Sequence, residues 1–208
     1  MKRKKIVIIG IVILMGVIAY IISPVFWSSV LSMELIKGNN EKVYNIIEQH
    51  RQCINVTGID SLGARQKPLE TACWWAGYDT ISELIEAGAD IHQCKVDLLH
   101  YVLGLYHPDD LQTIKLLQQE GMPISVELED NGNAFVDITF YDPDDVFQKA
   151  GQTKEDACKS QLELYRYVYE NATDDFDKKN ALKDSLELIE HNELLRDYIT
   201  KQLDNLER

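Results

Sequence analysis

The first strong pattern along the chain is an uninterrupted apolar segment close to its N-terminus. Residues 6–27 read IVIIGIVILMGVIAYIISPVFW, a run of 22 residues without a charged side chain. A helix of about 20 residues spans the hydrocarbon core of a bilayer, so this segment predicts one transmembrane helix. Pro24 lacks a backbone N–H donor and is expected to end or bend that helix.

The flank before this segment sets the expected orientation. Residues 2–5 are all basic, and positive flanks stay in the cytoplasm. We therefore expect residues 1–5 to be a cytoplasmic flank and residues 6–27 a single-pass signal anchor in the inner (plasma) membrane. The C-terminal domain would then lie in the periplasm or outside the cell. The alternative is a cleaved signal peptide, but its apolar core is about 7 to 15 residues long and precedes a small-residue cleavage site, which favours the uncleaved anchor here.

Beyond the apolar segment, the pattern changes to that of amphipathic helices. The clearest stretch is residues 68–92, PLETACWWAGYDTISELIEAGADIH. Ile81, Leu84 and Ile85 have the i, i+3, i+4 spacing that forms one buried stripe on a helix. Gly88 can adopt the left-handed conformation that ends a helix.

Residues 68–92 closely resemble an ankyrin repeat. In that family TPLHxAA opens a first helix, VxxLL forms a second, and GADIN leads into a hairpin finger. Here Pro68 opens the first helix, and Ala72 and Cys73 are the small residues that let a neighbouring helix pack closely. Residues 88–91 close the repeat.

Weaker copies of this pattern lie on both sides. Equivalent apolar positions are separated by 38, 30 and 37 residues, near the ankyrin period of about 33; they are Leu31, Leu69, Leu99 and Val136. The resemblance implies an all-α fold: an ankyrin-repeat solenoid over residues 28–141, with about four helix-turn-helix repeats and short hairpin fingers.

The segment around Asn131-Gly132 supports two interpretations. Residues 124–140 alternate between apolar and polar positions, which is also a strong signal for a β-hairpin. An ankyrin finger is itself a hairpin, so the interpretations differ in whether the chain from Phe135 onward is strand or helix. We favour helix.

The C-terminal residues 142–208 depart from the repeat pattern. We expect a loop at residues 142–145, a helix over residues 154–170, and one or two more helices across residues 180–205. Terminal repeats are atypical because their outer face meets water, so this region is interpreted as a divergent repeat and a C-terminal helical cap.

The charge of the chain limits its partners. The net charge is −13, and removal of the four basic residues 2–5 leaves −17 on the remainder. Such an acidic body would be repelled by the phosphates of nucleic acid. It suits a basic partner, or equally a well-solvated surface.

Motifs for catalysis and cofactor binding are absent from the sequence. It contains no Gly-rich phosphate loop, no Gly-x-Ser-x-Gly and no His-Glu-x-x-His. The pairs His92/Cys94 and His50/Cys53 lack a second pair of ligands at useful spacing for a metal. We therefore predict no catalytic residue, no metal and no cofactor, and a protein that is not an enzyme.

Two of the four cysteines raise the question of a disulfide. Cys53 and Cys94 fall near the ends of neighbouring repeats, and export would place them in an oxidising space. A Cys53–Cys94 bridge is one alternative, although connectivity does not follow from sequence.

The ankyrin resemblance also implies where a partner binds. Ankyrin stacks bind through finger tips and the exposed side of their first helices, and exposed aromatic side chains there are typical binding hot spots. The alternative for Trp74 or Trp75 is packing beneath the loop. The positions at or near this face are Arg65, Gln66, Lys67, Glu70, Trp74, Trp75, Tyr78, Tyr101, Tyr106, His107 and Asp109.

The whole layout resembles the membrane-anchored ankyrin proteins that bacteria keep in the periplasm as immunity factors. That resemblance implies a partner among secreted antibacterial toxins, including lipases delivered by type VI secretion. One alternative is a cell-envelope scaffold or assembly factor without a toxin partner. A second is an enzyme with an unrecognised site after Phe140.

Overall fold

The computed structural model describes residues 2–104, 107–127, 133–139, 153–189 and 191–208. Within these residues the regular structure is helical, apart from one antiparallel bridge between Glu127 and Asn133. This confirms the all-α prediction. The described chain forms two compact units: the N-terminal unit comprises Met1–Ala76 and Glu83–Asp90, and the C-terminal unit comprises Gly77–Ser82 and Ile91–Arg208.

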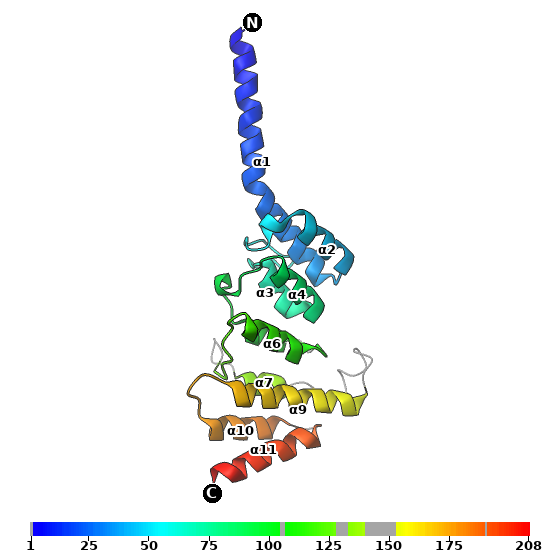
Figure 1. The fold of residues 1–208 in the computed structure, drawn as a ribbon, viewed down its shortest axis with the longest axis vertical. Coiled ribbons are helices and arrows are strands. Elements are labelled where there is room, and N and C mark those ends of the chain that lie inside the picture. Colours follow the sequence, from blue (N-terminus) through cyan, green and yellow to red (C-terminus); the bar gives the residue numbers. More distant parts are fainter. Residues whose placement is uncertain (1, 105–106, 128–132, 140–152, 190) are drawn as a thin grey trace. The chain divides into compact units, whose positions relative to one another are not determined.

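The helices follow one another along the chain (Figure 1). The order is α1 (Lys2–Ile36), α2 (Asn40–Gln49), η1 (Arg51–Cys53), α3 (Pro68–Trp75), α4 (Tyr78–Glu86), η2 (Ile91–Gln93), α5 (Leu98–Gly104), α6 (Asp110–Gln119), α7 (Ala134–Thr139), α9 (Lys154–Asn171), α10 (Lys178–Leu188) and α11 (Glu193–Leu206).

Helix α1 contains the whole apolar segment and continues beyond it. Among the described residues it is the one helix long and apolar enough to cross a membrane, judged by length and composition. Pro24 lies inside α1, so the expectation that it would end the helix is wrong. Proline removes one helix hydrogen bond and crowds the preceding turn, but the turns after Pro24 are held by packing in the N-terminal unit.

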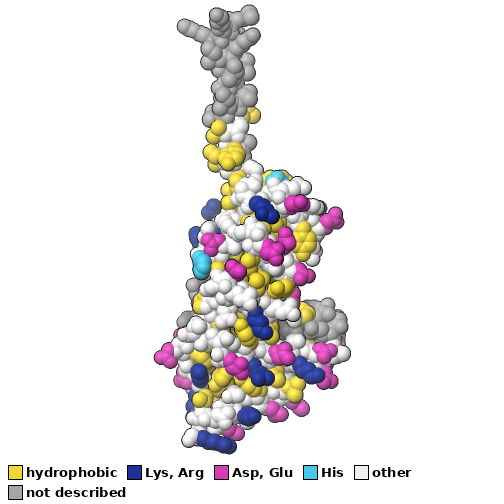
Figure 2. Space-filling model, viewed as in Figure 1, with side chains coloured by type: hydrophobic (Ala, Val, Ile, Leu, Met, Phe, Trp, Pro, Cys, Tyr) yellow, Lys and Arg dark blue, Asp and Glu magenta, His cyan; other side chains and the backbone are white. Residues whose placement is uncertain are grey.

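The surroundings of α1 change near residue 27. Before that point most of the described apolar side chains are exposed: Met15 is 65% exposed and Tyr20 82%. Beyond it, Ser28 and Leu31 are fully buried. Figures 1 and 2 show the first part of α1 extending away from α2 and α3, with hydrophobic side chains on its described surface.

The rest of the N-terminal unit packs around the last turns of α1. Helices α2 and α3 both contact α1. The apolar stripe of α2 is buried, and α3 approaches α1 closely enough for the Thr71 and Ser32 hydroxyls to lie 3.3 Å apart. Small side chains on both helices make this approach possible.

A loop between η1 and α3, here called the basal loop (Gly58–Gln66), is fixed against α1. The Gly58 N–H donates to the Gln66 carbonyl at 2.9 Å, which closes the loop at its base. A Cβ at Gly58 would lie 2.6 Å from the backbone nitrogen of Ser29 and 2.8 Å from the Ser28 carbonyl carbon. Glycine is therefore required by the closeness of the two backbones.

Helices α1, α4 and α6 end in the same hydrogen-bonded turn. The glycine after each helix has a positive φ, of 66° at Gly38, 102° at Gly88 and 99° at Gly121. Each glycine N–H donates to the carbonyl three residues back, and the next N–H donates five residues back, at 2.9 to 3.1 Å. This is the Schellman arrangement, and it confirms the predicted role of Gly88.

The C-terminal unit resolves the two interpretations of residues 124–140. Helix α7 starts at Ala134, so the helical prediction from Phe135 is confirmed and the strand alternative is wrong. Glu127 and Asn133 form the single bridge before it. The predicted loop at residues 142–145 lies outside the described residues.

The predicted C-terminal helices are also confirmed. Helix α9 covers the expected residues 154–170, and α10 and α11 cover residues 180–205 as two helices. They lie side by side in Figure 1. An aromatic cluster joins them to α7: the Phe135 ring stacks on Tyr165 with centroids 4.5 Å apart and meets Phe176 edge-on at 5.7 Å.

The close approach of the basal loop gives a stability prediction. We expect Gly58→Ala to lower the free energy of unfolding by about 1–3 kcal/mol, because the added methyl group meets the backbone of α1 and not a flexible side chain. Thermal unfolding of the full chain in mild detergent, followed by circular dichroism, measures this. Gly16→Ala is the matched control, since nothing lies within 4 Å of a Cβ there. Equal melting temperatures for the two variants would contradict the packing described.

Candidate partner-binding surface

The N-terminal unit carries six of the eleven predicted binding residues, all in or just before α3. Arg65 is exposed, and Trp74 and Trp75 are half-buried, as are Gln66 and Lys67. Neither tryptophan is fully packed beneath the loop, so both present part of their rings.

Glu70 is the exception in this group. Its side chain is buried and its carboxylate accepts a hydrogen bond from the Lys67 N–H at 2.7 Å. This bond satisfies a backbone donor at the start of α3. Glu70 therefore caps the start of α3, and its buried side chain is not accessible to a partner.

The C-terminal unit carries the other predicted residues. Tyr78, Tyr101, His107 and Asp109 are half-buried, and Tyr106 lies outside the described residues. Asp109 Oδ2 accepts a hydrogen bond from the Tyr78 N–H at 2.6 Å. Because Tyr78 is the first residue of α4, Asp109 caps that helix from a distant part of the sequence. The sequence did not predict this role.

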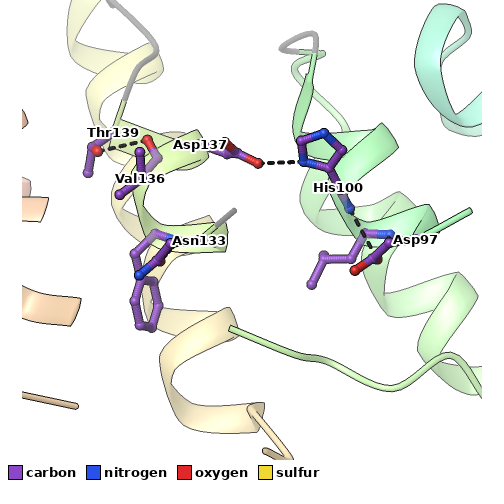
Figure 3. Close-up of polar contacts among 8 residues, drawn as sticks. Asp97, His100, Asn133, Val136, Asp137 and Thr139 are labelled. Carbon is purple, nitrogen blue, oxygen red and sulfur yellow. Dashed lines mark hydrogen bonds and ion pairs between the residues drawn. The ribbon is translucent and has the colours of Figure 1, made fainter. Parts of the chain in front are cut away.

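A carboxylate and an imidazole form a polar contact that sequence reasoning missed. His100 Nδ1 on α5 lies 2.9 Å from Asp137 Oδ2 on α7 (Figure 3). The Asp97 carboxylate accepts hydrogen bonds from the backbone N–H groups of Leu99 and His100, which fixes the start of α5. The signal was available: 37 residues separate Leu99 from Val136, and the same step takes His100 to Asp137.

The environment of Asp137 shifts its protonation. Burial raises the pKa of the Asp137 carboxyl, the His100 ring lowers it through hydrogen bonding and charge, and Asp97 raises it; the result is a pKa above the usual value of 3.8. The His100–Asp137 contact therefore joins α5 to α7 and is sensitive to protonation.

Asp110, the first residue of α6, is a second carboxylate whose pKa is raised. Burial raises its pKa well above 3.8, while the hydrogen bond from the His107 N–H lowers it and neighbouring Asp109 raises it. That N–H donates at 2.8 Å. The contact satisfies the backbone N–H of His107 in the turn just before α6, which is a structural use of a buried acid.

A small hollow lies between two loops of the C-terminal unit. Its volume is about 230 Å³, and residues from 91–98 and 121–125 line it, including His92, Val96 and Met122. Ligand pockets for small molecules and cofactors are typically about 300–1,000 Å³. A hollow of this size suits a single side chain of a bound protein.

Metal-ligating side chains do not gather within the part of the chain that the structure describes. No group of three or more His, Cys, Asp or Glu side chains there is placed to hold a metal ion. Among the described residues, the pairs His92/Cys94 and His50/Cys53 are thus not part of such a group.

The suggested Cys53–Cys94 disulfide is not formed in this structure. Cys53 is a free thiol, fully buried in the core of the N-terminal unit. Burial raises the pKa of the Cys53 thiol to about 11, although its own backbone N–H lowers it. A thiol with these properties behaves as an inert core residue.

The acidic character of the chain is spread over its surface. Figure 2 shows Asp and Glu side chains scattered over the face in view, with Lys and Arg among them. The charge therefore does not mark one docking patch on this face.

Comparison of the chain with protein-family models and with curated proteins gives no match.

The raised pKa of Asp137 gives a pH prediction. The Asp137 carboxyl binds its proton more tightly in the folded chain than in the unfolded chain. Its contribution to stability is therefore fully present below pH 3.8, and it is lost as the pH rises through the raised pKa of the folded chain. We expect the difference in free energy of unfolding between the native chain and Asp137→Asn to shrink as the pH rises across this range. Urea unfolding at a series of pH values measures it, with exposed Asp175→Asn as control. A difference that does not change with pH would contradict the assignment.

The buried thiol gives a labelling prediction. At pH 8 a thiol with a pKa of about 11 is only about 0.1% thiolate, and Cys53 is fully buried, so we expect iodoacetamide to modify it only after unfolding. Half-buried Cys94 should react faster in the folded chain. Peptide mapping by mass spectrometry reads both sites. Recovery of a Cys53–Cys94 cross-linked peptide from exported protein would show instead that the bridge forms.

Proposed function

We propose that this protein is a membrane-anchored, ankyrin-type module that works by binding another protein. Residues 6–27 would hold it in the membrane, and the helical units would recognise the partner. The observation that carries the repeat part of this proposal is a contact that recurs between successive helix pairs.

The recurring contact joins a loop residue to the glycine that ends a later helix. Asn55, which follows Ile54, donates from Nδ2 to the Gly88 carbonyl at 2.7 Å and accepts from the Asp90 N–H at 2.9 Å. His92, which follows Ile91, packs its ring against Gly121, where a Cβ would lie 3.2 Å from Cε1.

The spacing of these contacts matches a repeat. Gly88 and Gly121 are 33 residues apart and end α4 and α6 with the same turn, which is the ankyrin period. In the ankyrin pattern, Asn55 and His92 occupy the finger position that follows GADI. At the same position of two successive repeats, a side chain contacts the helix-ending glycine of the next repeat. This recurrence supports the ankyrin class of fold.

The anchoring part of the proposal is supported by the exposed surface of α1. A helix that presents apolar side chains to its surroundings on several sides is unfavourable in water and favourable in lipid. Tyr20, Ile21, Ile22 and Phe26 are each more than half exposed. The basic residues 2–5 support a cytoplasmic N-terminus, with both helical units exported.

Protein binding is supported by what the predicted surface presents. Parts of Trp74 and Trp75 are accessible in the N-terminal unit, and Arg65 of the same unit is exposed. Tryptophan and arginine are enriched among the residues that dominate binding energy. In the C-terminal unit, the hollow lined by His92 and Met122 fits one protein side chain.

The particular role that we propose is that of a periplasmic immunity protein. Such a protein would bind and inhibit a secreted antibacterial toxin, with a lipase-like effector of type VI secretion as the expected kind. The single apolar helix, the small exported domain and the acidic body support this role, since a basic toxin would be attracted to it. A cell-envelope scaffold without a toxin partner is the second candidate, favoured by the same anchor and repeats.

Variants of the tryptophans test the binding surface. Full-length protein in mild detergent is immobilised, the partner retained from source cells is identified, and its affinity is measured with the purified protein. We expect Trp74→Ala and Trp75→Ala to weaken binding, by about 30-fold where a hot spot contributes 2 kcal/mol. Tyr44→Ala is the matched control, because Tyr44 is an exposed aromatic residue of the same unit outside the surface.

The activity of the partner separates the two roles. A secreted hydrolase that loses its activity at a 1:1 ratio with this protein would support immunity. An envelope component that binds without inhibition would support the scaffold. Unchanged affinity in both tryptophan variants would overturn the assigned surface.

A further inference from the structure

The basal loop is attached to α1 at the point where the apolar segment ends. Ser28 Oγ donates to the Val56 carbonyl at 2.6 Å. Ser29 Oγ accepts from the Ile59 N–H at 2.9 Å and donates to the Val25 carbonyl at 2.9 Å. These bonds place the backbone of Ile59 beside the last turn of the apolar segment.

The tip of the basal loop is held in one conformation by Asp60. The Asp60 carboxylate, itself buried, accepts from the N–H groups of Leu62 and Ala64 at 2.8 Å each. The Asp60 N–H donates to the Ala64 carbonyl at 3.0 Å. The single acid of the loop is therefore used within the loop, and Arg65 is the charged side chain that the loop exposes.

This ordered loop presents apolar side chains outward. Leu62 is 72% exposed and Ile59 is 50% exposed. Apolar side chains that gather on an ordered surface mark a site of contact with a protein or a membrane. The neighbouring end of α1 is apolar too, since Phe26 is 56% exposed.

The position of the basal loop along α1 indicates which surface covers these side chains. Ser29 lies two residues beyond Trp27, which is about 3 Å along a helix axis. The polar interface of a bilayer is about 5–8 Å thick on each side of the hydrocarbon core. If α1 crosses the membrane through residues 6–27, the base of the loop lies within that interface. Trp27 supports this depth, because tryptophan is enriched at the membrane interface. Its ring stacks on His50 with the ring centroids 3.7 Å apart.

We propose that the basal loop is a second membrane-contact site, in which Ile59 and Leu62 enter the lipid interface beside α1 and Arg65 faces the headgroups. The ligand is a phospholipid surface, and anionic headgroups would favour Arg65. This inference rests on the proposed anchoring by residues 6–27. It adds that the N-terminal unit lies on the membrane and is held at two points.

Site-specific photocrosslinking in the full chain tests the contact. A photoreactive diazirine amino acid is introduced singly at Tyr20, Ile59, Leu62 or Glu41, and each protein is reconstituted in phosphatidylcholine–phosphatidylglycerol vesicles and irradiated. Tyr20 reports on the anchor, and Glu41 is an exposed control on α2. Mass spectrometry then identifies lipid or protein adducts. We expect lipid adducts at positions 20, 59 and 62, with yields at least about ten-fold above position 41, because lipid is concentrated at an inserted side chain.

The outcomes separate this inference from the proposed anchoring. Lipid adducts at position 20 without adducts at positions 59 and 62 would overturn the loop contact and leave the anchor intact. Absence of lipid adducts at position 20 would overturn the anchor itself. Protein adducts at position 62 in place of lipid would mean that the loop is a protein interface, which also overturns the proposal.

Discussion

The N-terminal unit depends on one close approach between two backbones. Gly58 of the basal loop lies so near Ser28 and Ser29 that a side chain has no room, and the serine hydroxyls complete the contact with hydrogen bonds to Val56 and Ile59. This contact turns the end of a long apolar helix into the first helix of a folded core. Thr71 of α3 and the buried stripe of α2 then pack on the same turns of α1. The first part of α1 thereby stays outside the core, and its last turns form part of the core.

The C-terminal unit is held by polar contacts within an aromatic and aliphatic core. His100 and Asp137 join α5 to α7, and the Gln161 side chain donates to the Ile138 carbonyl at 2.7 Å. Burial raises the pKa of Tyr165, so its hydroxyl stays protonated and shares a 3.0 Å hydrogen bond with Ser185. Because a buried polar group is costly without a partner, the contacts of buried Gln161 and Tyr165 select one arrangement of these helices.

Local patterns predicted the helices well, because the 3.6-residue period of buried positions and a helix-ending glycine such as Gly88 are written in short stretches of sequence. The helix over residues 154–170 and one or two helices across residues 180–205 were predicted from the sequence, while the all-α class and the helix from Phe135 were expected from the ankyrin resemblance. The surface was harder to predict. Glu70 and Asp109 became helix caps, and the partner of Asp109 is the backbone of Tyr78, 31 residues away. Nearly every residue has a backbone N–H, so the sequence does not indicate which one a carboxylate will bind. Such capping roles are recognised only in the folded structure.

The continuity of α1 determines how far the N-terminal unit can reach. The helix runs without interruption from Lys2 to Ile36 and enters the core directly, so no flexible linker separates the two. A module on a flexible tether sweeps a large volume and meets partners at a correspondingly low effective concentration. In the anchored protein that we propose, the N-terminal unit instead has a small search volume. It would encounter molecules that travel along or emerge at the bilayer surface, and would miss those that stay in the surrounding solution.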